Sequence, residues 1–263
     1  MATVRSKDGT TIGYDQVGQG PALVLVDAAG GFRGFGPMGA LAAELASSFT
    51  VVTYDRRGRG ESTDTLPYAI EREVEDLGAV IAAVGGPAFV EGFSSGAVLA
   101  LYAAGQGLPI TKVAMLEPPL DLDGPPDTTL AAELTELVSA GRRGDAVLHF
   151  HTSIGVPEEI TAGMRHAPFW PELEKLAHTL VYDTTITSTL TTAQVRGITV
   201  PTLVVNSEET DDRLRGWATH VAATLPNGEH RQLKGEWHGV SPEVLAPVLT
   251  EFFLSKSRRS PRS

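Results

Sequence analysis

The chain has 263 residues, 42% of them hydrophobic, and a formal net charge of −11 at pH 7 from 21 basic and 32 acidic side chains. A nucleic-acid-binding surface needs a basic face against the phosphates, so this balance argues against one. The sequence contains no cysteine, which excludes disulfides, thiolate nucleophiles and cysteine-ligated metals. His149 and His151 form an H-x-H pair without a third ligand in a recognisable pattern, so we predict no metal site.

Neither end of the chain has the pattern of a targeting or membrane segment. The start, MATVRSKDGT, lacks the apolar core of a signal peptide, and no run approaches the ~18 apolar residues that span a bilayer. We therefore expect a cytoplasmic protein with no membrane partner. Residues 256–263 carry four basic side chains without an apolar partner, which predicts a disordered basic tail.

Short β-branched runs alternate with helical patterns, which predicts an α/β fold with a mostly parallel central sheet flanked by helices. The expected strands are Thr11–Val17, Ala22–Asp27, Thr50–Tyr54, Ala88–Glu91, Thr111–Leu116, Pro201–Asn206 and Glu229–Leu233. Between the third and fourth strands, apolar residues spaced by three and four predict a helix with one buried stripe: Val74, Leu77, Val80, Ile81 and Val84. We expect the acidic side chains of this helix on the opposite face, in water.

The pattern changes after the strand that ends at Glu117. From residue 120 to 197 we find no good strand, and helical stretches follow one another. Such an insertion usually forms a cap over one edge of the sheet. The predicted organisation is an α/β core of residues 1–119 and 198–255, with a helical cap of residues 120–197 inserted after Glu117.

A candidate nucleophile follows the fourth predicted strand. Gly92-Phe-Ser94-Ser-Gly96 lies between a strand and a helical run, which matches G-x-S-x-G in the setting of a nucleophile elbow. The N-terminus of the next helix favours negative charge near Ser94. A serine hydroxyl needs a base to attack, and His238, in the loop after the last predicted strand, occupies the position that this topology gives the base. We predict that Ser94 and His238 act together.

A tetrahedral intermediate on the serine would need two preorganised N–H donors. We expect them from the backbone of Ser95 and of Ala28 or Ala29, in the loop after the second predicted strand. The same loop holds a dinucleotide-binding pattern, G-x-G-x-x-G, that begins at Gly34. Six residues separate this glycine from the predicted strand end, and Pro37 removes one donor, so we set that interpretation aside.

With these motifs, the chain resembles the α/β-hydrolase family over nearly its whole length. The segment Tyr54–Ser62, YDRRGRGES, is similar to the family's D-x-R-G-x-G-x-S turn, which is mainly structural there. Many members have His-Gly-x where this chain has Asp27-Ala28-Ala29, a change that alters loop geometry more than chemistry because the donors are backbone groups. The resemblance implies a small-molecule substrate, no cofactor, and a monomer or homodimer.

The acid that orients His238 has two candidate positions. The family usually carries it after the penultimate strand, where the matching residue in LVVNSEETDD is Thr210, so that Asp211 or Asp212 would have to shift into place. Some members carry it one strand earlier, which here is Glu117. A carboxylate at a buried strand end is costly without a partner such as a histidine. We favour Glu117 and keep the two aspartates as alternatives.

We expect the cap to select the substrate. Met164, Phe169, Trp170 and Trp237 could line an apolar cleft, although residues of this kind are more often part of a core. The predicted reaction is hydrolysis of a carboxylic ester or lactone of a moderately apolar small molecule, through an acyl-enzyme on Ser94. The alternatives are a non-hydrolytic enzyme on the same fold (lyase, cofactor-free oxygenase or cyclase), a perhydrolase, and a slow-turnover ligand receptor.

Overall fold

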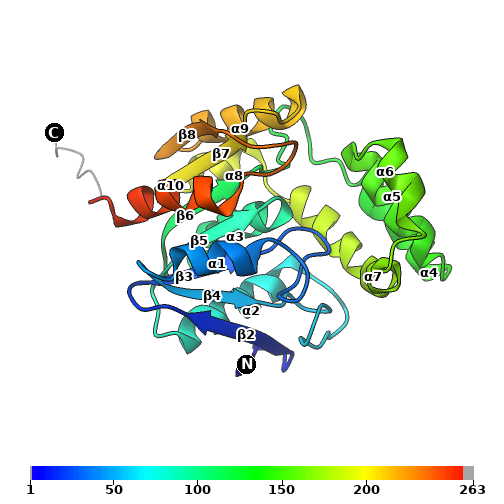
Figure 1. Cartoon of the computed structure of the whole chain (residues 1–263), viewed down its shortest axis with the longest axis horizontal. Helices are drawn as coiled ribbons and strands as arrows, with labels where there is room; N and C mark the ends of the chain where they lie inside the picture. The colour runs from blue at the N-terminus through cyan, green and yellow to red at the C-terminus, as the bar shows by residue number, and fades with distance from the viewer. Residues whose placement is uncertain (1, 257–263) are drawn as a thin grey trace.

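A single eight-stranded sheet with helices on both faces organises the computed structural model, which describes residues 2–256 (Figure 1). Its strand order is β1-β2-β4-β3-β5-β6-β7-β8, and all neighbours from β4 to β8 are parallel. The predicted α/β class is confirmed. The strands are β1 (Ala2–Arg5), β2 (Thr11–Val17), β3 (Ala22–Val26), β4 (Thr50–Tyr54), β5 (Ala88–Phe93), β6 (Ile110–Leu116), β7 (Thr202–Ser207) and β8 (Gly228–Leu233).

The seven predicted strands occur within two residues of their predicted bounds, and β1 is an additional strand that was not predicted. This edge strand pairs antiparallel with β2 and is mostly exposed, so it lacks the apolar pattern by which a strand is recognised. The helices are α1 (Met38–Leu45), α2 (Ile70–Ala83), α3 (Ser95–Gly105), α4 (Thr129–Ser139), α5 (Arg143–Ile154), α6 (Glu158–Met164), α7 (Trp170–Thr187), α8 (Thr192–Gly197), α9 (Asp212–Thr224) and α10 (Pro242–Leu254).

Alternate residues of the central strands pack into two separate cores. On one face, Val24 and Val26 of β3 pack with side chains of α2, α3 and α9; on the other face, Leu23 and Leu25 pack with α1 and α10. Strands buried on both faces are apolar without alternation, as in LVLV here. Because these strands are parallel and in register, their carboxyl ends lie along one edge of the sheet.

Between β6 and β7 the chain forms helices α4 to α8, and no strand lies between Leu116 and Thr202. Helices α4, α5 and α7 pack together around a small hydrophobic core of their own, which includes Leu134, Phe150 and Trp170. Figure 1 shows α4 to α6 standing away from the sheet, with α7 between them and the rest of the chain. Helix α7 packs against α3, the helix that follows the nucleophile candidate.

The expectation that the acidic side chains of α2 lie in water was wrong for two of them, while Glu71 is exposed. Glu73 and Asp76 are buried, each at 1% exposure. Their partners are Arg56, whose Nε lies 2.7 Å from Glu73 Oε2, and Arg57, whose Nε lies 2.8 Å from Asp76 Oδ2. Helical periodicity cannot reveal such partners, because the arginines come from a turn after β4 that is distant in sequence.

Among residues 2–256, none of the helices has the length and apolar character needed to cross a membrane. Within the tail predicted to be disordered, residues 257–263 lie outside the described part of the chain.

Strand β5 carries one buried acid, Glu91. Neither carboxylate oxygen of Glu91 has a hydrogen bond within residues 2–256, and burial, followed by the nearby charge of Asp27, raises the pKa of Glu91 to about 8. Ionisation of a carboxyl group whose pKa is higher in the folded chain costs folding free energy. The contribution of the protonated carboxyl group to the free energy of unfolding is therefore fully present below the unfolded-state pKa of 4.5. It is lost as the pH rises through the folded-state pKa of about 8.

We predict that Glu91→Met raises the free energy of unfolding by roughly 3 kcal/mol at pH 8 and changes it much less at pH 5. Methionine fills a similar volume and carries no ionisable group. Urea unfolding of both proteins at the two pH values measures the difference. An equal gain at pH 5 and pH 8 would mean that Glu91 does not ionise in this range.

Candidate active site

The turn between β5 and α3 holds Ser94 in a strained conformation, with φ of 53° and ψ of −122°. A Cβ on Gly92 would lie 2.3 Å from the Gly96 carbonyl oxygen, and a Cβ on Gly96 would lie 2.3 Å from the Val26 carbonyl oxygen. Real Cβ atoms do not approach oxygen so closely, so glycine is needed at both positions. The two glycines of the motif let the chain reverse sharply enough to leave Ser94 at the carboxyl edge of the sheet.

The loop between β8 and α10 brings His238 to this serine. The Nε2 atom of His238 lies 3.0 Å from Ser94 Oγ, across 144 positions of sequence. The imidazole ring packs beside Phe93, at 5.1 Å between ring centroids, and beside Trp237, at 5.4 Å. The structure thus brings the predicted nucleophile and base within hydrogen-bonding distance.

Glu117 lies behind the histidine, fully buried at the end of β6. Its Oε2 is 3.6 Å from His238 Nδ1, an ion-pair distance that is longer than a hydrogen bond. The same carboxylate accepts hydrogen bonds from the Ser207 N–H at 2.6 Å and from Thr210 Oγ1 at 2.7 Å. His238 Nδ1 is buried and has no other partner in the described chain, so Glu117 is the carboxylate that faces it.

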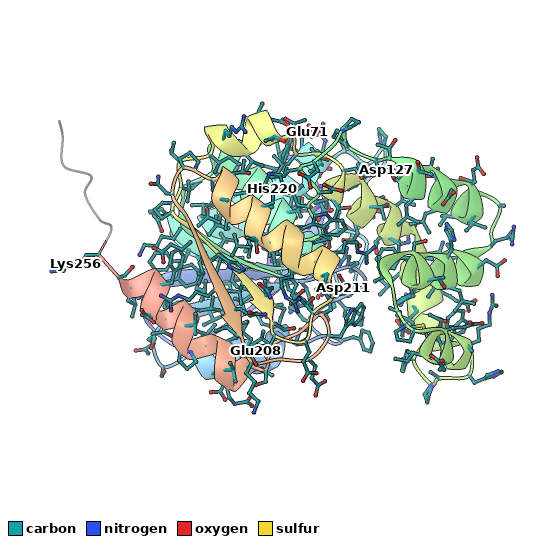
Figure 2. All side chains as sticks on the ribbon, turned by 90° about the horizontal axis from the view of Figure 1, so that it is seen from above. Glu71, Asp127, Glu208, Asp211, His220 and Lys256 are labelled. Carbon is teal, nitrogen blue, oxygen red and sulfur yellow. The ribbon has the colours of Figure 1, made fainter. Side chains whose placement is uncertain are left out.

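Asp211 and Asp212, the alternative acids, have other partners. Asp211 caps the N-terminus of α9 (Figure 2), where its Oδ1 accepts from the Leu214 N–H at 2.8 Å. Asp212 is almost fully exposed and pairs with Arg215 on the same helix. The hydroxyl of Thr210, at the position where the family usually carries the acid, donates to Glu117.

Backbone strain marks the same three residues. Within residues 2–256, Ser94, Glu117 and His238 are the only non-glycine residues with positive φ, at 53°, 51° and 54°. Such conformations cost on the order of 1–3 kcal/mol each and cluster at functional sites. The fold holds all three residues of the candidate triad in conformations that side chains normally avoid.

The structure discriminates between the two candidate oxyanion donors in the loop after β3. The Ala28 N–H donates to Asp27 Oδ1 at 2.8 Å. The N–H groups of Ala29 and Ser95 have no hydrogen-bond partner in the described part of the chain. Both residues line a cavity together with Ser94 and His238. Ala29 and Ser95 therefore present the two free donors that a developing oxyanion needs.

A cluster of buried charged side chains lies next to the loop after β3. Asp183, on α7, is 1% exposed; its Oδ1 lies 2.7 Å from Arg56 Nη1, and its Oδ2 lies 2.7 Å from Arg59 Nη2. It also accepts a hydrogen bond from Ser95 Oγ at 2.7 Å. Burial alone would raise the pKa of Asp183, but Arg59 and Arg56 hold it below its ordinary value.

The main cavity at this edge of the sheet has a volume of about 570 Å³ and contacts Ser94, Ser95, Ala28, Ala29 and His238. It lies between the carboxyl ends of the strands and helices α4, α5, α7 and α9. Its apolar lining comes from Leu130, Phe150, Ile154, Leu214, Trp217 and Trp237.

Of the four predicted cleft residues, only Trp237 lines the main cavity. Trp170 is buried in the core of the helical segment, and Met164 packs against that core. Phe169 is 40% exposed and packs against Phe35, at 5.8 Å between ring centroids. The size and apolar character of a side chain do not distinguish a cavity wall from a helix–helix contact. For this reason, three of the four predicted residues lie outside the main cavity.

Among the cavity residues that were not predicted from the sequence are one aspartate and one histidine. Asp183 lines the main cavity from α7, and His151 lines it from α5. Asp183 lies within an ordinary helical pattern, and no sequence signal distinguishes it as a cavity residue. His151 was considered only as half of a metal pair, but His149 contacts Glu133 whereas His151 contacts its own helix.

Comparison with known proteins identifies the family of this chain. Residues 23–248 match the profile of the alpha/beta hydrolase family, and the chain belongs to that family. The structure is similar to that of an alpha/beta hydrolase from Sphaerobacter thermophilus, with a TM-score of 0.87 and 47% identity, over 96% of this chain and 100% of the other.

The chain also matches curated proteins, among them RutD and YraK. The putative carbamate hydrolase RutD of Pantoea ananatis is 26% identical over 256 residues, which covers 88% of this chain and 87% of RutD. The uncharacterized hydrolase YraK of Bacillus subtilis is 38% identical over 97 residues, only about a third (35%) of either chain. The family and these relatives support a hydrolase of this superfamily.

Proposed function

We propose that this protein is a serine hydrolase that cleaves a carboxylic ester or lactone of a moderately apolar small molecule through an acyl-enzyme on Ser94. The observation that carries the proposal is the 3.0 Å contact between Ser94 Oγ and His238 Nε2 at a strained turn. It is supported by two free backbone N–H groups beside the serine, at Ala29 and Ser95.

In the first half-reaction, His238 Nε2 takes the proton of Ser94 Oγ as the oxygen attacks the substrate carbonyl carbon. The carbonyl oxygen becomes an oxyanion that accepts hydrogen bonds from the N–H groups of Ala29 and Ser95. When the intermediate collapses, the carbon–oxygen bond to the alcohol breaks and His238 gives its proton to the leaving oxygen. In a lactone, the same step opens the ring.

In the second half-reaction, water gives a proton to His238 and attacks the acyl carbon, and the acid leaves as Ser94 regains its proton. Glu117 acts through His238: its charge favours the tautomer with hydrogen on Nδ1 and stabilises the imidazolium that forms in each half-reaction. The hydrogen bonds from Ser207 and Thr210 hold this carboxylate in its orientation.

We further propose that residues 120–197 act as a cap that selects the substrate. Helices α4, α5 and α7 of this segment supply apolar and hydroxyl side chains to the main cavity, among them Leu130, Phe150 and Thr187. A volume of about 570 Å³ suits a small molecule, since ligand pockets commonly measure about 300–1,000 Å³. The proposed substrate is therefore a small molecule, and the two proposed half-reactions need no cofactor.

A fluorophosphonate probe and a substrate panel test the proposal. The panel contains esters and lactones of increasing size and, because of the similarity to RutD, a set of carbamates. We expect turnover of esters or lactones and a single phosphonate adduct, mapped by mass spectrometry to Ser94. Tight binding of panel members without hydrolysis would favour the receptor alternative. Conversion of a lactone to a product other than its hydroxy acid would favour a non-hydrolytic enzyme.

A further inference from the structure

Helix α5 presents His151 to the active-site cavities in one tautomer. Its Nδ1 atom lies 2.7 Å from the Val147 carbonyl oxygen, one helical turn earlier. A carbonyl oxygen can only accept a hydrogen bond, so Nδ1 carries the hydrogen. Burial lowers the pKa of His151, which favours the neutral ring. In that ring, Nε2 is a hydrogen-bond acceptor.

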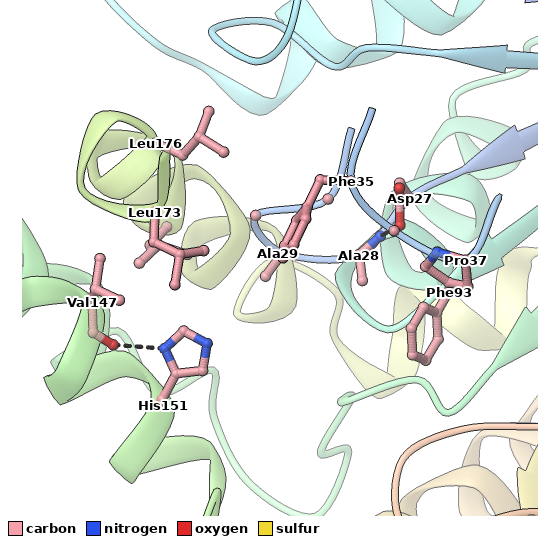
Figure 3. Close-up of a pocket in the computed structure, with 14 residues that line it drawn as sticks. Asp27, Ala28, Ala29, Phe35, Pro37, Phe93, Val147, His151, Leu173 and Leu176 are labelled. Carbon is pink, nitrogen blue, oxygen red and sulfur yellow. Dashed lines mark hydrogen bonds between the residues drawn. The ribbon is translucent and has the colours of Figure 1, made fainter. Parts of the chain in front are cut away.

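Within residues 2–256, no group donates a hydrogen bond to this acceptor. The ring lines both the main cavity and a side cavity of about 200 Å³. Figure 3 shows the side cavity, with the imidazole on α5 facing across it toward the loop that holds Ala28 and Ala29. Since that loop carries a proposed oxyanion donor, a group in the side cavity would lie next to the reacting carbonyl.

The side cavity is apolar apart from two acceptors. Its lining side chains are alanine, valine, leucine, proline and phenylalanine, together with His151 and Asp27. Asp27 Oδ1 accepts from the Ala28 N–H, and Asp27 Oδ2 has no partner in the described residues. No lining side chain of this cavity has a hydrogen left to donate when Asp27 is ionised. Asp27 Oδ2 is a buried acceptor without a donor, which is costly, and a ligand that brings a donor to this cavity would find an open acceptor in His151 Nε2 or Asp27 Oδ2.

We propose that the side cavity takes a hydroxyl-bearing apolar portion of the substrate, and that the hydroxyl donates its hydrogen bond to His151 Nε2. The proposal rests on the proposed function, because it refines the substrate class of the same site. The preferred substrate is then a hydroxy ester, or a lactone with a free hydroxyl. A site built around a hydrogen bond discriminates against the analogue that lacks the hydroxyl.

Two matched substrate series test this inference. One compares p-nitrophenyl hexanoate with its 3- and 6-hydroxy derivatives; the other compares hexyl butyrate with butyrate monoesters of hexanediols. The 4- and 5-hydroxy p-nitrophenyl esters are left out because they cyclise spontaneously with release of p-nitrophenol. We expect at least one hydroxylated member to exceed its parent in kcat/KM by about tenfold, and His151→Leu to remove this preference. His151→Gln, which keeps an acceptor near the same place, is expected to retain part of it.

His166→Leu is the matched control, because His166 is exposed in the same helical segment and lines neither cavity. Calorimetric binding of the same esters to Ser94→Ala, with and without His151→Leu, gives a readout that needs no turnover. A hydroxyl preference in binding without wild-type hydrolysis would sink the proposed function and keep this inference. Equal hydroxyl preference in wild type and His151→Leu, in both rate and binding, would overturn the inference.

A second inference concerns the buried arginines of the turn after β4. Arg59 Nη1 donates to the Ala28 carbonyl oxygen at 2.6 Å and to the Gly31 carbonyl oxygen at 3.2 Å. The Ala28–Ala29 peptide is trans, and in a trans peptide the C=O and N–H groups point in opposite directions. By holding the carbonyl of Ala28, Arg59 turns the N–H of Ala29 the other way, into the cavity.

Asp183 connects this arrangement to the other donor. It receives two hydrogen bonds from Arg59 Nη2, at 2.8 and 2.7 Å, and one from the hydroxyl of Ser95 at 2.7 Å. One carboxylate on α7 therefore contacts both the arginine that orients Ala29 and the residue that carries the second free N–H. We infer that Arg59 and Asp183 are positioning residues for the oxyanion hole, an inference that also rests on the proposed function.

We predict that Arg59→Met lowers kcat by about 10²-fold with little change in KM, and weakens a boronic acid inhibitor by a similar factor. Arg59→Lys, which can reach one partner but not both, should recover part of the loss. Arg57→Met is the matched control: Arg57 is equally buried in the same turn but contacts Asp76 and Asp8 instead of the oxyanion loop. It should lose stability while its kcat remains close to wild type.

Equal losses of kcat in Arg59→Met and Arg57→Met would overturn the positioning role, because general destabilisation would then explain both. A crystal structure of Arg59→Met gives a readout independent of turnover. We expect the Ala28–Ala29 peptide to rotate; an unchanged peptide direction would refute the inference even if the protein hydrolysed no ester.

Discussion

Replacing Ser94 with alanine is expected to lower kcat for a cleaved ester by about 10⁴- to 10⁶-fold, and His238→Ala is expected to do the same. The reason is that the two side chains act as one unit: the histidine has no role in attack without the hydroxyl, and the hydroxyl is a poor nucleophile without the base. Their 3.0 Å contact is the structural basis. The double variant should therefore be no slower than either single variant.

Steady-state kinetics of the three variants, with burst measurements for acyl-enzyme, checks this prediction. Binding of a product acid should stay within a few-fold of wild type, because neither change removes the cavity wall. Ser95→Ala keeps its backbone N–H and serves as the neighbouring-serine control, with a far smaller loss. If the losses of the two single variants multiplied in the double variant, Ser94 and His238 would be acting in separate steps.

The second large effect is expected at Glu117. Glu117→Gln should lower kcat by about 10³- to 10⁴-fold, because a neutral amide neither stabilises the imidazolium nor fixes the tautomer of His238. Asp211→Asn and Asp212→Asn should leave kcat within about twofold. Asp211 already caps α9 and Asp212 is exposed on the same helix, so Asp211→Asn retains a capping side chain and costs little stability.

Thr210 allows a sharper test of the same acid. Its hydroxyl lies 2.7 Å from Glu117 Oε2. Thr210→Asp therefore introduces a carboxylate beside the position where Glu117→Gln removes the negative charge. We expect the double variant to recover at least tenfold of the activity that Glu117→Gln loses. Full activity in Glu117→Gln alone, or loss confined to an aspartate variant, would show that the orienting acid lies after β7.

The sheet was largely predictable because the strands that build it are buried on both faces. Such strands are short, apolar and β-branched, and the sequence marks them locally. The G-x-S-x-G turn was predictable for a related reason: Gly92 and Gly96 are required by contacts that the turn itself creates with its own helix and the adjacent strand. The family of the chain follows from these local features and is confirmed by the match over residues 23–248.

Much of the site's environment depends on contacts between residues far apart in the chain. Glu73 and Asp76 looked like solvated helix residues, yet each is buried against an arginine of the turn after β4. Asp183 and His151 had no distinguishing pattern, and only the packing of α5 and α7 brings them to the cavities. The choice of Ala29 over Ala28 depended on one hydrogen bond, which the Ala28 N–H donates to the Asp27 carboxylate.

Local pattern and glycine placement encode strands and turns, so the α/β class, the sharp turn at Ser94 and the candidate partners of that serine could be read from the amino-acid sequence. The tertiary structure decided which acid faces His238. Glu117 and Asp211 are similar in sequence context, as carboxylates near strand ends, but a buried charge persists only where other groups satisfy it. The Ser207 N–H, the Thr210 hydroxyl and His238 meet at Glu117, and no local pattern could specify that convergence.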